Sequence, residues 1–194
     1  RQMGSDAHSH STTYIRENLD LNLVNGRYAS GLVRELTEMY DGRTDNVFAI
    51  FDEIAGLEGH PIARPSLTKP PSRFAKSPLQ GLWHKHYHQS AFIPTNVVNH
   101  WRANGFADHL KETAAKIPIA DDKMMGFLLH EFVISGYRDR SQARRLTGEW
   151  IIYARQDDRN TYLTLGIHGD DHAIYERVQA CANEFPDLEL MRRL

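Results

Sequence analysis

Three histidines at alternate positions are the strongest chemical signal in this 194-residue sequence. They lie in the segment Leu82–Gln89, which reads LWHKHYHQ. Successive side chains of an extended strand point to opposite faces, so His84, His86 and His88 are predicted to line one face. Imidazoles titrate near neutral pH and serve both as acid–base catalysts and as metal ligands. The segment therefore predicts a functional site and leaves open which of these two chemistries it carries.

A predicted antiparallel hairpin adds polar groups that can meet the histidines. Residues 149–155 and 161–168 read as its two strands, because the polar turn QDDRN separates two apolar stretches. In the second strand, apolar residues alternate with Tyr162, Thr164 and His168. If helices cover the apolar face of the sheet, the polar face stays open and gathers these residues with the histidines.

This shared open face depends on how the histidine segment is oriented. Trp83 and Tyr87 are predicted to pack against helices on the face opposite to the histidines. The arrangement fails if Leu82 belongs to the core, because Leu82 shares the histidine face and its burial would turn that face inward.

Acid–base cleavage of RNA is the first function that such a face predicts, and it needs no cofactor. Attack by the neighbouring 2′-hydroxyl requires a base, an acid for the leaving 5′-oxygen, and a cation or hydrogen-bond donor for the phosphate. The predicted catalytic residues are His84, Lys85, His86, Thr164 and His168. The predicted substrate-binding residues are His88, Tyr153, Arg155, Tyr162, Arg144 and Arg145.

A zinc-dependent hydrolase is the alternative use of the same histidines. Three residues at alternate positions of one strand spread over about 13 Å, so a single ion engages at most two neighbours. Further ligands would come from the segment that follows the hairpin. The predicted ligands in this alternative are His84, His86, His168 and His172.

Composition places the chain among globular proteins without a membrane span. Hydrophobic residues make up 41% and charged residues 25% of the sequence. No apolar run approaches the roughly 18 residues that a transmembrane helix needs. The single cysteine, Cys181, excludes an internal disulfide and a cysteine-based zinc site. The N-terminus lacks the apolar segment of a signal peptide, so we expect a cytoplasmic protein or one delivered into a target cell.

Charge is unevenly distributed along the chain. Residues 60–155 contain 14 Lys and Arg against 7 Asp and Glu, whereas the net charge of the whole chain is −2. A basic central region between acidic ends can form a phosphate-binding face. Ordinary surface charge that segregates along the chain without forming a patch is the alternative.

The chain divides into four segments with an α+β architecture. Residues 1–13 are a polar lead-in, beginning with RQMGS in the manner of residues added for expression, and are expected to be disordered. Residues 14–59 are a helical hairpin, and residues 60–80 a proline-rich basic connection that excludes a helix or a central strand. Residues 81–194 form a small antiparallel sheet of about three or more strands packed against helices.

Helical patterns flank the predicted strands. Apolar spacings of three and four residues predict the hairpin helices within 27–40 and 47–57, with Thr44 or Asp45 as the cap between them. Further helices are predicted over 96–116, from 121 onward, and over 170–185.

The layout resembles that of colicin D-like and RelE-like ribonuclease toxins. The segment Lys85-His86-Tyr87, then Phe92-Ile93-Pro94 and a helix from Asn96, is similar in layout to the lysine–histidine region of colicin D-like tRNA nucleases. The resemblance covers residues 79–185 and rests on the order of elements. It implies an RNA target and a partner antitoxin or immunity protein. The net charge of −2 departs from the strongly basic charge usual in such toxins.

A non-enzymatic interaction or effector module is the remaining alternative. The sequence contains no Walker loop, no G-x-S-x-G, no H-E-x-x-H and no G-x-G-x-x-G. The prediction of a ribonuclease thus depends on the histidines and on the strand faces that position them.

Overall fold

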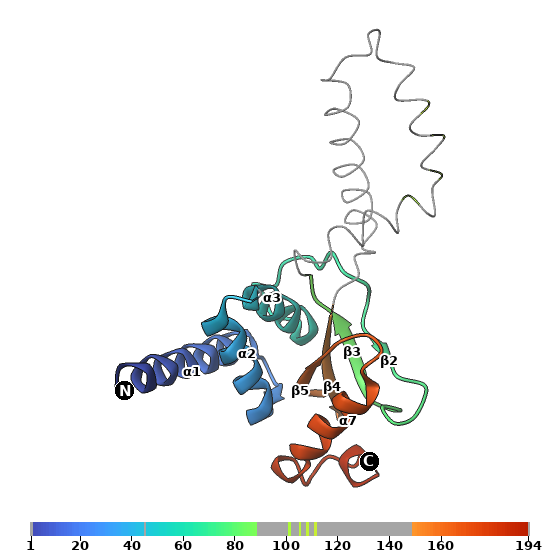
Figure 1. The fold of residues 1–194 in the computed structure, drawn as a ribbon. Coiled ribbons are helices and arrows are strands. Elements are labelled where there is room, and N and C mark those ends of the chain that lie inside the picture. The colour runs from blue at the N-terminus through green and yellow to red at the C-terminus, as the bar shows by residue number, and fades with distance from the viewer. Residues whose placement is uncertain are drawn as a thin grey trace.

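A computed structural model of the chain describes residues 2–44, 46–88 and 149–193, together with residues 101, 105, 108 and 111. In this part of the chain, α-helices and a five-stranded mixed sheet form an α+β fold, as predicted (Figure 1). The predicted helices over 96–116 and from 121 onward lie, apart from those single residues, outside the described residues.

The sheet has the strand order β1-β5-β4-β3-β2, and all neighbours are antiparallel except β1 and β5. The predicted hairpin is confirmed as β4 and β5, and the histidine strand as β3. The short edge strands β1 and β2 were not predicted. The strands are β1 (Arg27–Tyr28), β2 (Ser72–Arg73), β3 (Trp83–His86), β4 (Trp150–Gln156) and β5 (Arg159–Gly166).

The proline-rich connection is ordered along the sheet rather than detached from it. Its residues 72–73 form β2 at the sheet edge, where the prolines on either side remove no ladder hydrogen bond. This placement agrees with the prediction that the segment could not form a central strand.

The two predicted N-terminal helices are α2 (Ser30–Gly42) and α3 (Val47–Glu58). The side chain of Asn46, rather than Thr44 or Asp45, caps α3 by accepting from the backbone N–H of Phe48 at 3.1 Å. The helix ends at Gly59, whose φ of 66° is the left-handed conformation that glycine adopts readily.

The lead-in expected to be disordered is instead part of a helix, α1 (Gln2–Asn22). Polar residues fill its first half, so the sequence alone gave no apolar stripe there. Its second half carries Ile15 and Leu19, four residues apart and both fully buried. Packing of this apolar pair anchors a helix that its propensities alone do not predict.

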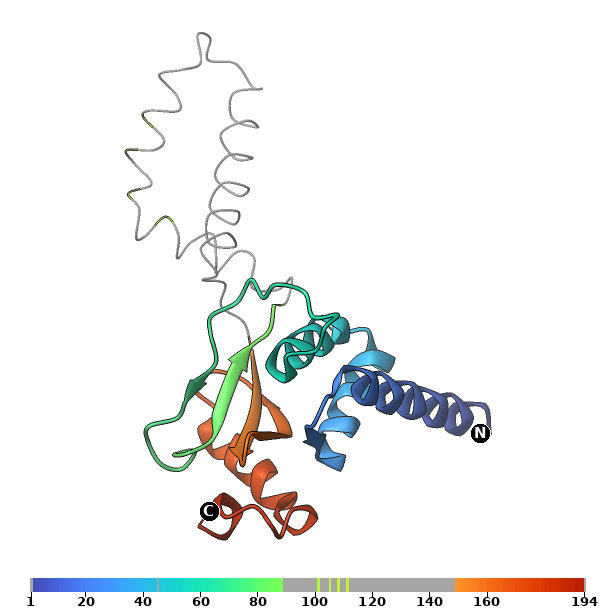
Figure 2. The same ribbon diagram turned by 180° about the vertical axis from the view of Figure 1, so that it is seen from behind.

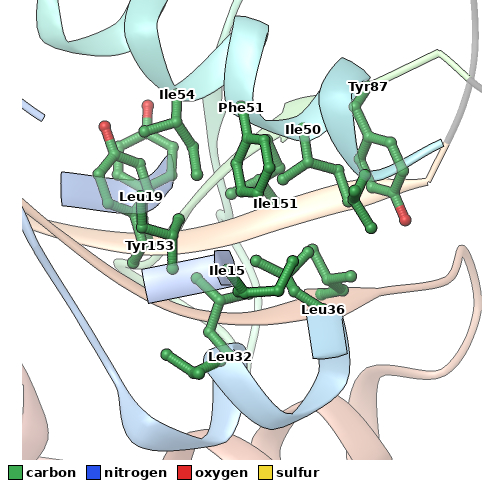
Figure 3. Packing of buried hydrophobic residues seen from close by; sticks show 14 residues of the cluster. Ile15, Leu19, Leu32, Leu36, Ile50, Phe51, Ile54, Tyr87, Ile151 and Tyr153 are labelled. Atoms are coloured by element: carbon green, nitrogen blue, oxygen red, sulfur yellow. The ribbon is translucent and has the colours of Figure 1, made fainter. Parts of the chain in front are cut away.

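One hydrophobic core lies between α1, α2, α3 and the sheet. Figure 3 shows Ile15 and Leu19 of α1 and Ile50 and Phe51 of α3 packed against side chains of β4. The sheet contributes Ile151, Tyr153, Tyr162 and Leu165 to this core, Tyr87 adds to it directly after β3, and Trp83 packs against it.

A second core covers the opposite face of the sheet. Figure 2 shows α7 (Asp171–Ala180) and the C-terminal segment on the side away from α1 and α3. At Gly166 a Cβ would lie 2.7 Å from Ile174 of α7, so the glycine permits close packing of helix and strand. Both faces of the sheet are therefore packed, which corrects the expectation of one fully open face.

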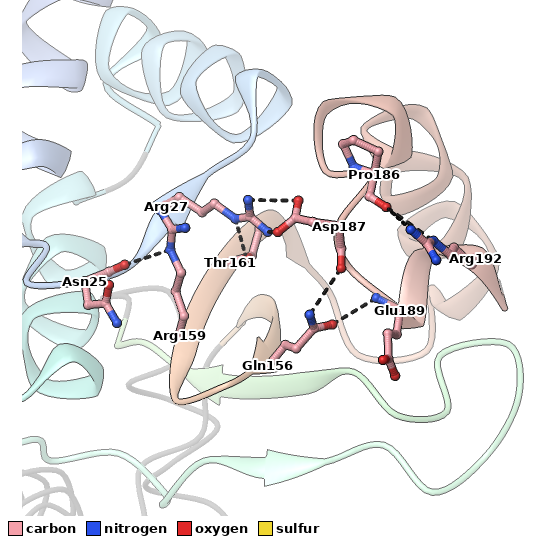
Figure 4. A network of polar contacts seen from close by, with 9 residues as sticks. All are labelled: Asn25, Arg27, Gln156, Arg159, Thr161, Pro186, Asp187, Glu189 and Arg192. Atoms are coloured by element: carbon pink, nitrogen blue, oxygen red, sulfur yellow. Dashed lines mark hydrogen bonds and ion pairs between the residues drawn. The ribbon is translucent and has the colours of Figure 1, made fainter.

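The C-terminal segment is tied to the sheet by polar contacts (Figure 4). Arg27 donates to both carboxylate oxygens of Asp187, at 3.0 and 2.6 Å. Gln156 donates to the Asp187 carbonyl and accepts from the backbone N–H of Glu189. These contacts fix two short 3₁₀ turns, η2 (Ala182–Glu184) and η3 (Leu190–Arg192).

Within the described residues, none of the helices combines the length and apolarity needed to cross a bilayer.

Candidate functional site

Three of the predicted catalytic histidines gather around one tryptophan on the α7 side of the sheet. The ring of Trp150 lies 4.7 Å from that of His84, 6.0 Å from that of His86 and 4.3 Å from that of His168. We call these four residues the histidine cluster. His84 and His86 come from β3, Trp150 begins β4, and His168 follows β5. Adjacent strand ends thus bring together residues separated by more than 80 positions in sequence.

Exposure differs from one member of the cluster to the next. His86 is buried and accepts a hydrogen bond from the indole N–H of Trp150 at 3.3 Å. His84 is half-buried, and His168 is exposed to solvent. The cluster therefore runs from the core to the surface and offers two of its imidazoles to a bound molecule.

The electrostatic environment keeps His84 neutral. Burial, followed by the positive charge of His86, His168 and Lys69 when those groups are protonated, lowers the pKa of His84 to about 4. A neutral imidazole has a lone pair that can accept a proton, so His84 is in the form that a base requires, although a pKa of about 4 makes it a weak base at neutral pH.

Ser72 on β2 contacts His84, with 3.0 Å between the serine Oγ and Nε2 of the ring. Nδ1 of His84 is buried and has no hydrogen-bond partner among the residues that the structure describes. A catalytic triad needs a third group that orients the base through this second nitrogen. The Ser72–His84 pair therefore does not have the arrangement of a serine hydrolase.

Leu82 is fully buried in the second core, on the face of the histidines. Burial of Leu82 turns the face that it shares with the histidines inward, so the predicted open face does not form. The histidines are turned toward α7 and Phe74, whose ring lies 4.5 Å from that of His84. Trp83 is not exposed in exchange, because it packs on the first core.

Lys85 points to the opposite face and is not a member of the histidine cluster. It is 4% exposed and forms an ion pair with Glu53 of α3 at 3.1 Å. Its ammonium group also donates to Ser66 Oγ at 2.8 Å, to Thr68 Oγ1 and to the carbonyl of Lys69 at 2.8 Å. These contacts hold the proline-rich connection against β3. Lys85 thus orients this connection instead of facing a substrate.

Tyr153 and Tyr162, predicted to bind substrate, are buried in the first core, 5.7 Å apart. A bulge separates them from the histidines: Tyr153 pairs with Tyr162, but Ile152 pairs with Thr164, which leaves Leu163 extra in β5. One additional residue reverses which side chains face each core. Burial raises the pKa of Tyr153 to about 12, which suits a structural phenol.

Thr164 lies beyond the bulge but is held away from the histidine cluster. It is 1% exposed, donates to Glu35 at 2.6 Å and accepts from Arg177 Nε at 3.0 Å. Glu35 also accepts from the N–H of Leu165, and Arg177 donates to the Leu165 carbonyl. The side chains of Glu35 and Arg177 thereby bond the backbone N–H and C=O of Leu165, which a neighbouring strand would otherwise pair with at this edge of β5. Burial raises the pKa of Glu35 despite these opposing hydrogen bonds.

The remaining predicted residues are dispersed. Arg155 lies at the hairpin turn, about 17 Å along β4 from Trp150, and pairs with Asp158. His88 is half-buried two residues beyond β3, and His172 is exposed in the first turn of α7. The other two predicted substrate-binding residues, Arg144 and Arg145, lie outside the described residues.

The zinc alternative receives no geometric support from the part of the chain that the structure describes. There, no three His, Cys, Asp or Glu side chains are arranged so that they could hold a metal ion.

Sequence reasoning missed the residues that assemble the histidine cluster. Trp150 was not among the predicted site residues, and Ser72 and Phe74 lie in the proline-rich connection, where the prolines obscure a strand of two residues. One signal in the sequence could have indicated this strand. The residues between Pro71 and the histidine segment are numerous enough for the chain to fold back and pair with β3 as an edge strand.

Comparison of the chain with known protein families, curated proteins and solved structures gives no match. The function is therefore inferred from the site alone.

Proposed function

We propose that this protein is a metal-independent ribonuclease that uses the histidine cluster for acid–base catalysis. The observation that carries the proposal is the meeting of His84 and His168 on the ring of Trp150, one half-buried and one exposed. RNA supplies its own nucleophile in the 2′-hydroxyl, so two proton-transfer groups suffice for cleavage.

The different environments of His84 and His168 suggest a different role for each in catalysis. His84, with a pKa of about 4, is neutral at physiological pH and takes the proton of the 2′-hydroxyl. His168, at the exposed end of the cluster, gives a proton to the leaving 5′-oxygen. The ammonium group of exposed Lys69, close enough to influence His84, stabilises charge on the phosphate. The products are a 2′,3′-cyclic phosphate and a free 5′-hydroxyl.

The proposal keeps the toxin-like biology that the layout resemblance implies. A partner antitoxin or immunity protein would then act by covering the exposed end of the histidine cluster at His168. Localisation in the cytoplasm or in a target cell stays a prediction.

The test is cleavage of total RNA in the presence and absence of EDTA by the wild type and by three single variants. His84→Ala and His168→Ala are each expected to lower cleavage by about 10²-fold or more, because each removes one proton-transfer group. His172→Ala is the matched control: its imidazole is exposed four residues from His168 but lies outside the cluster. Each variant is checked for cooperative melting.

The outcomes separate the candidates. Cleavage that persists in EDTA and depends on His84 and His168 supports the proposal, and the acid limb of kcat/KM should lie near pH 4 rather than 6.5. Cleavage lost in EDTA and restored by zinc would replace it with the metal-dependent hydrolase. An absence of cleavage in folded wild-type protein would contradict it and favour a binding module.

A further inference from the structure

A pocket at the β2–β3 turn lies at the opposite end of β3 from His86 and contains none of the residues of the histidine cluster. Its volume is about 380 Å³, which is within the size range of small-ligand sites, and it is open to solvent. The turn supplies five of its lining residues, and α7 and the C-terminal segment supply three. The lining residues are Arg73, Ser77, Pro78, Gln80, Gly81, Tyr175, Leu190 and Arg193.

The lining carries two guanidinium groups and no carboxylate. Arg73 donates through Nε to the carbonyl of Gly81 at 3.1 Å, which orients its side chain. Its two Nη groups have no hydrogen-bond or ion-pair partner in the described part of the chain. Arg193 is 77% exposed, and the Glu189 carboxylate lies 3.8 Å away. The pocket thus holds one guanidinium without an ionic partner among the described residues, that of Arg73, and a second one, that of Arg193, in a long and exposed ion pair with Glu189.

The shape of the pocket depends on a glycine that no other residue can replace without strain. Gly81 has a φ of 98°, and a Cβ at this position would lie 2.9 Å from a methyl group of Leu190. The turn and the C-terminal segment can therefore approach closely enough for Arg73 and Arg193 to line one cavity.

We propose that this pocket binds a phosphate group. Planar guanidinium groups with free N–H donors match phosphate oxygens, and the Ser77 hydroxyl and Gln80 amide add neutral donors. The phosphate can be free in solution or part of a nucleic-acid strand.

The position of the pocket favours a phosphate that belongs to an RNA strand over free phosphate. This part of the inference rests on the proposed ribonuclease function. Ser72 and Arg73 are consecutive: the first contacts His84 and the second lines the pocket. From Gly81, before β3, to His84 within it, an extended chain advances about 10 Å. An RNA strand cleaved at the histidine cluster can therefore place a neighbouring backbone phosphate between Arg73 and Arg193.

Binding, rather than cleavage, tests the pocket. The probes are inorganic phosphate, followed by NMR, and a fluorescent oligonucleotide with 2′-O-methyl groups, which keeps every phosphate but lacks the nucleophile. Arg73→Gln and Arg193→Gln are each expected to weaken oligonucleotide binding roughly tenfold at low salt. Each should also reduce the slope of log K against log salt by about 0.7, the value for one lost contact with a single strand.

Arg64→Gln is the matched control, because it removes the same charge from an exposed arginine that lies beside Asp52 on α3, outside the pocket. It should leave affinity and slope unchanged. Arg193→Gln keeps the test valid if Arg73→Gln disturbs the turn, because the side chain of Arg193 is 77% exposed and its ion pair is with Glu189 in its own segment.

The outcomes distinguish the pocket from the proposed function. Oligonucleotide binding that is unaffected by both variants overturns the pocket, even if the wild type cleaves RNA. Weakened binding in both variants supports the pocket, even if the wild type does not cleave RNA. Inorganic phosphate that perturbs Arg73 and Arg193, with no oligonucleotide binding, supports a site for free phosphate and overturns the strand source.

Discussion

The two faces of the sheet treat polar side chains of the same strand in opposite ways. On the α1–α3 side, the buried ammonium of Lys85 meets a carboxylate, two hydroxyls and a carbonyl. On the α7 side, its neighbour His84 has one hydrogen bond, to Ser72, and a buried nitrogen without a partner among the described residues. Buried polar groups are normally satisfied, and those that are not often belong to functional sites. On this strand, hydrogen bonding therefore distinguishes Lys85, whose ammonium group is fully bonded, from His84, which is the candidate functional residue.

The largest effect is expected from breaking the satisfied face. Glu53→Ala leaves the Lys85 ammonium buried without its counter-charge, and should lower the free energy of unfolding by about 3–5 kcal/mol. Burial already lowers the pKa of Lys85, and Glu53 opposes that shift. Urea denaturation measures the loss. The double variant Glu53→Leu/Lys85→Met should recover much of it, because two apolar side chains leave no buried charge. A loss below about 1 kcal/mol in Glu53→Ala would mean that solvent reaches the pair.

A smaller, pH-dependent effect is expected from the less satisfied face. The pKa of His84 is about 4 in the folded protein against 6.5 when exposed, so the unfolded chain binds this proton more tightly. The contribution of His84 to stability is therefore complete above about pH 6.5 and is lost as the pH falls through about 4. Between about pH 7 and pH 4.5, wild-type protein should lose on the order of 1–2 kcal/mol more than His84→Asn, after allowing for solvent screening. Equal losses in thermal melts of the two proteins would show that His84 is not desolvated.

Two consecutive isoleucines of β4 sharpen the comparison further. Ile151 pairs with Lys85 and Ile152 with His84, and both are fully buried, on opposite faces. Ile→Val at either position should cost about 0.5–1.5 kcal/mol of stability. Only Ile152→Val is expected to raise the pKa of His84, by a few tenths of a unit, because it loosens the packing that desolvates the ring. NMR titration of the histidine C–H resonances measures this shift. An equal shift in Ile151→Val would show that the two faces do not act independently.

The sequence predicts elements well where a single periodicity applies. The apolar spacings of α2 and α3, the hairpin turn and the alternation of Trp83, His84 and His86 all correspond to described structure. Each of these depends on contacts between residues close in sequence. The meeting of His84 with His168 could also be anticipated, because both were assigned to one sheet.

The faces could not be predicted beyond the bulge. Strict alternation from Tyr162 to His168 places Tyr162 and Thr164 on the same face of the sheet. The extra residue Leu163 instead turns their side chains to opposite faces. The bulge depends on how β4 pairs with β5, and the alternation of polar and apolar residues within β5 does not indicate it. Similarly, the partner of Lys85 is Glu53, 32 residues away on a helix, and only tertiary packing brings them together.

The smallest effect on stability is expected at the exposed end of the histidine cluster. His168 follows β5, is exposed to solvent, and contacts the ring of Trp150 at 4.3 Å. His168→Ala removes no buried group, so the free energy of unfolding should change by less than about 0.5 kcal/mol. It also removes an electrostatic interaction that lowers the pKa of His84, so this pKa should rise slightly toward its ordinary value. Urea denaturation and NMR titration of the same variant measure both quantities. A large loss of stability would place His168 in the core of the α7 face, and with it the whole cluster would become structural, like Lys85 on the other side of the sheet.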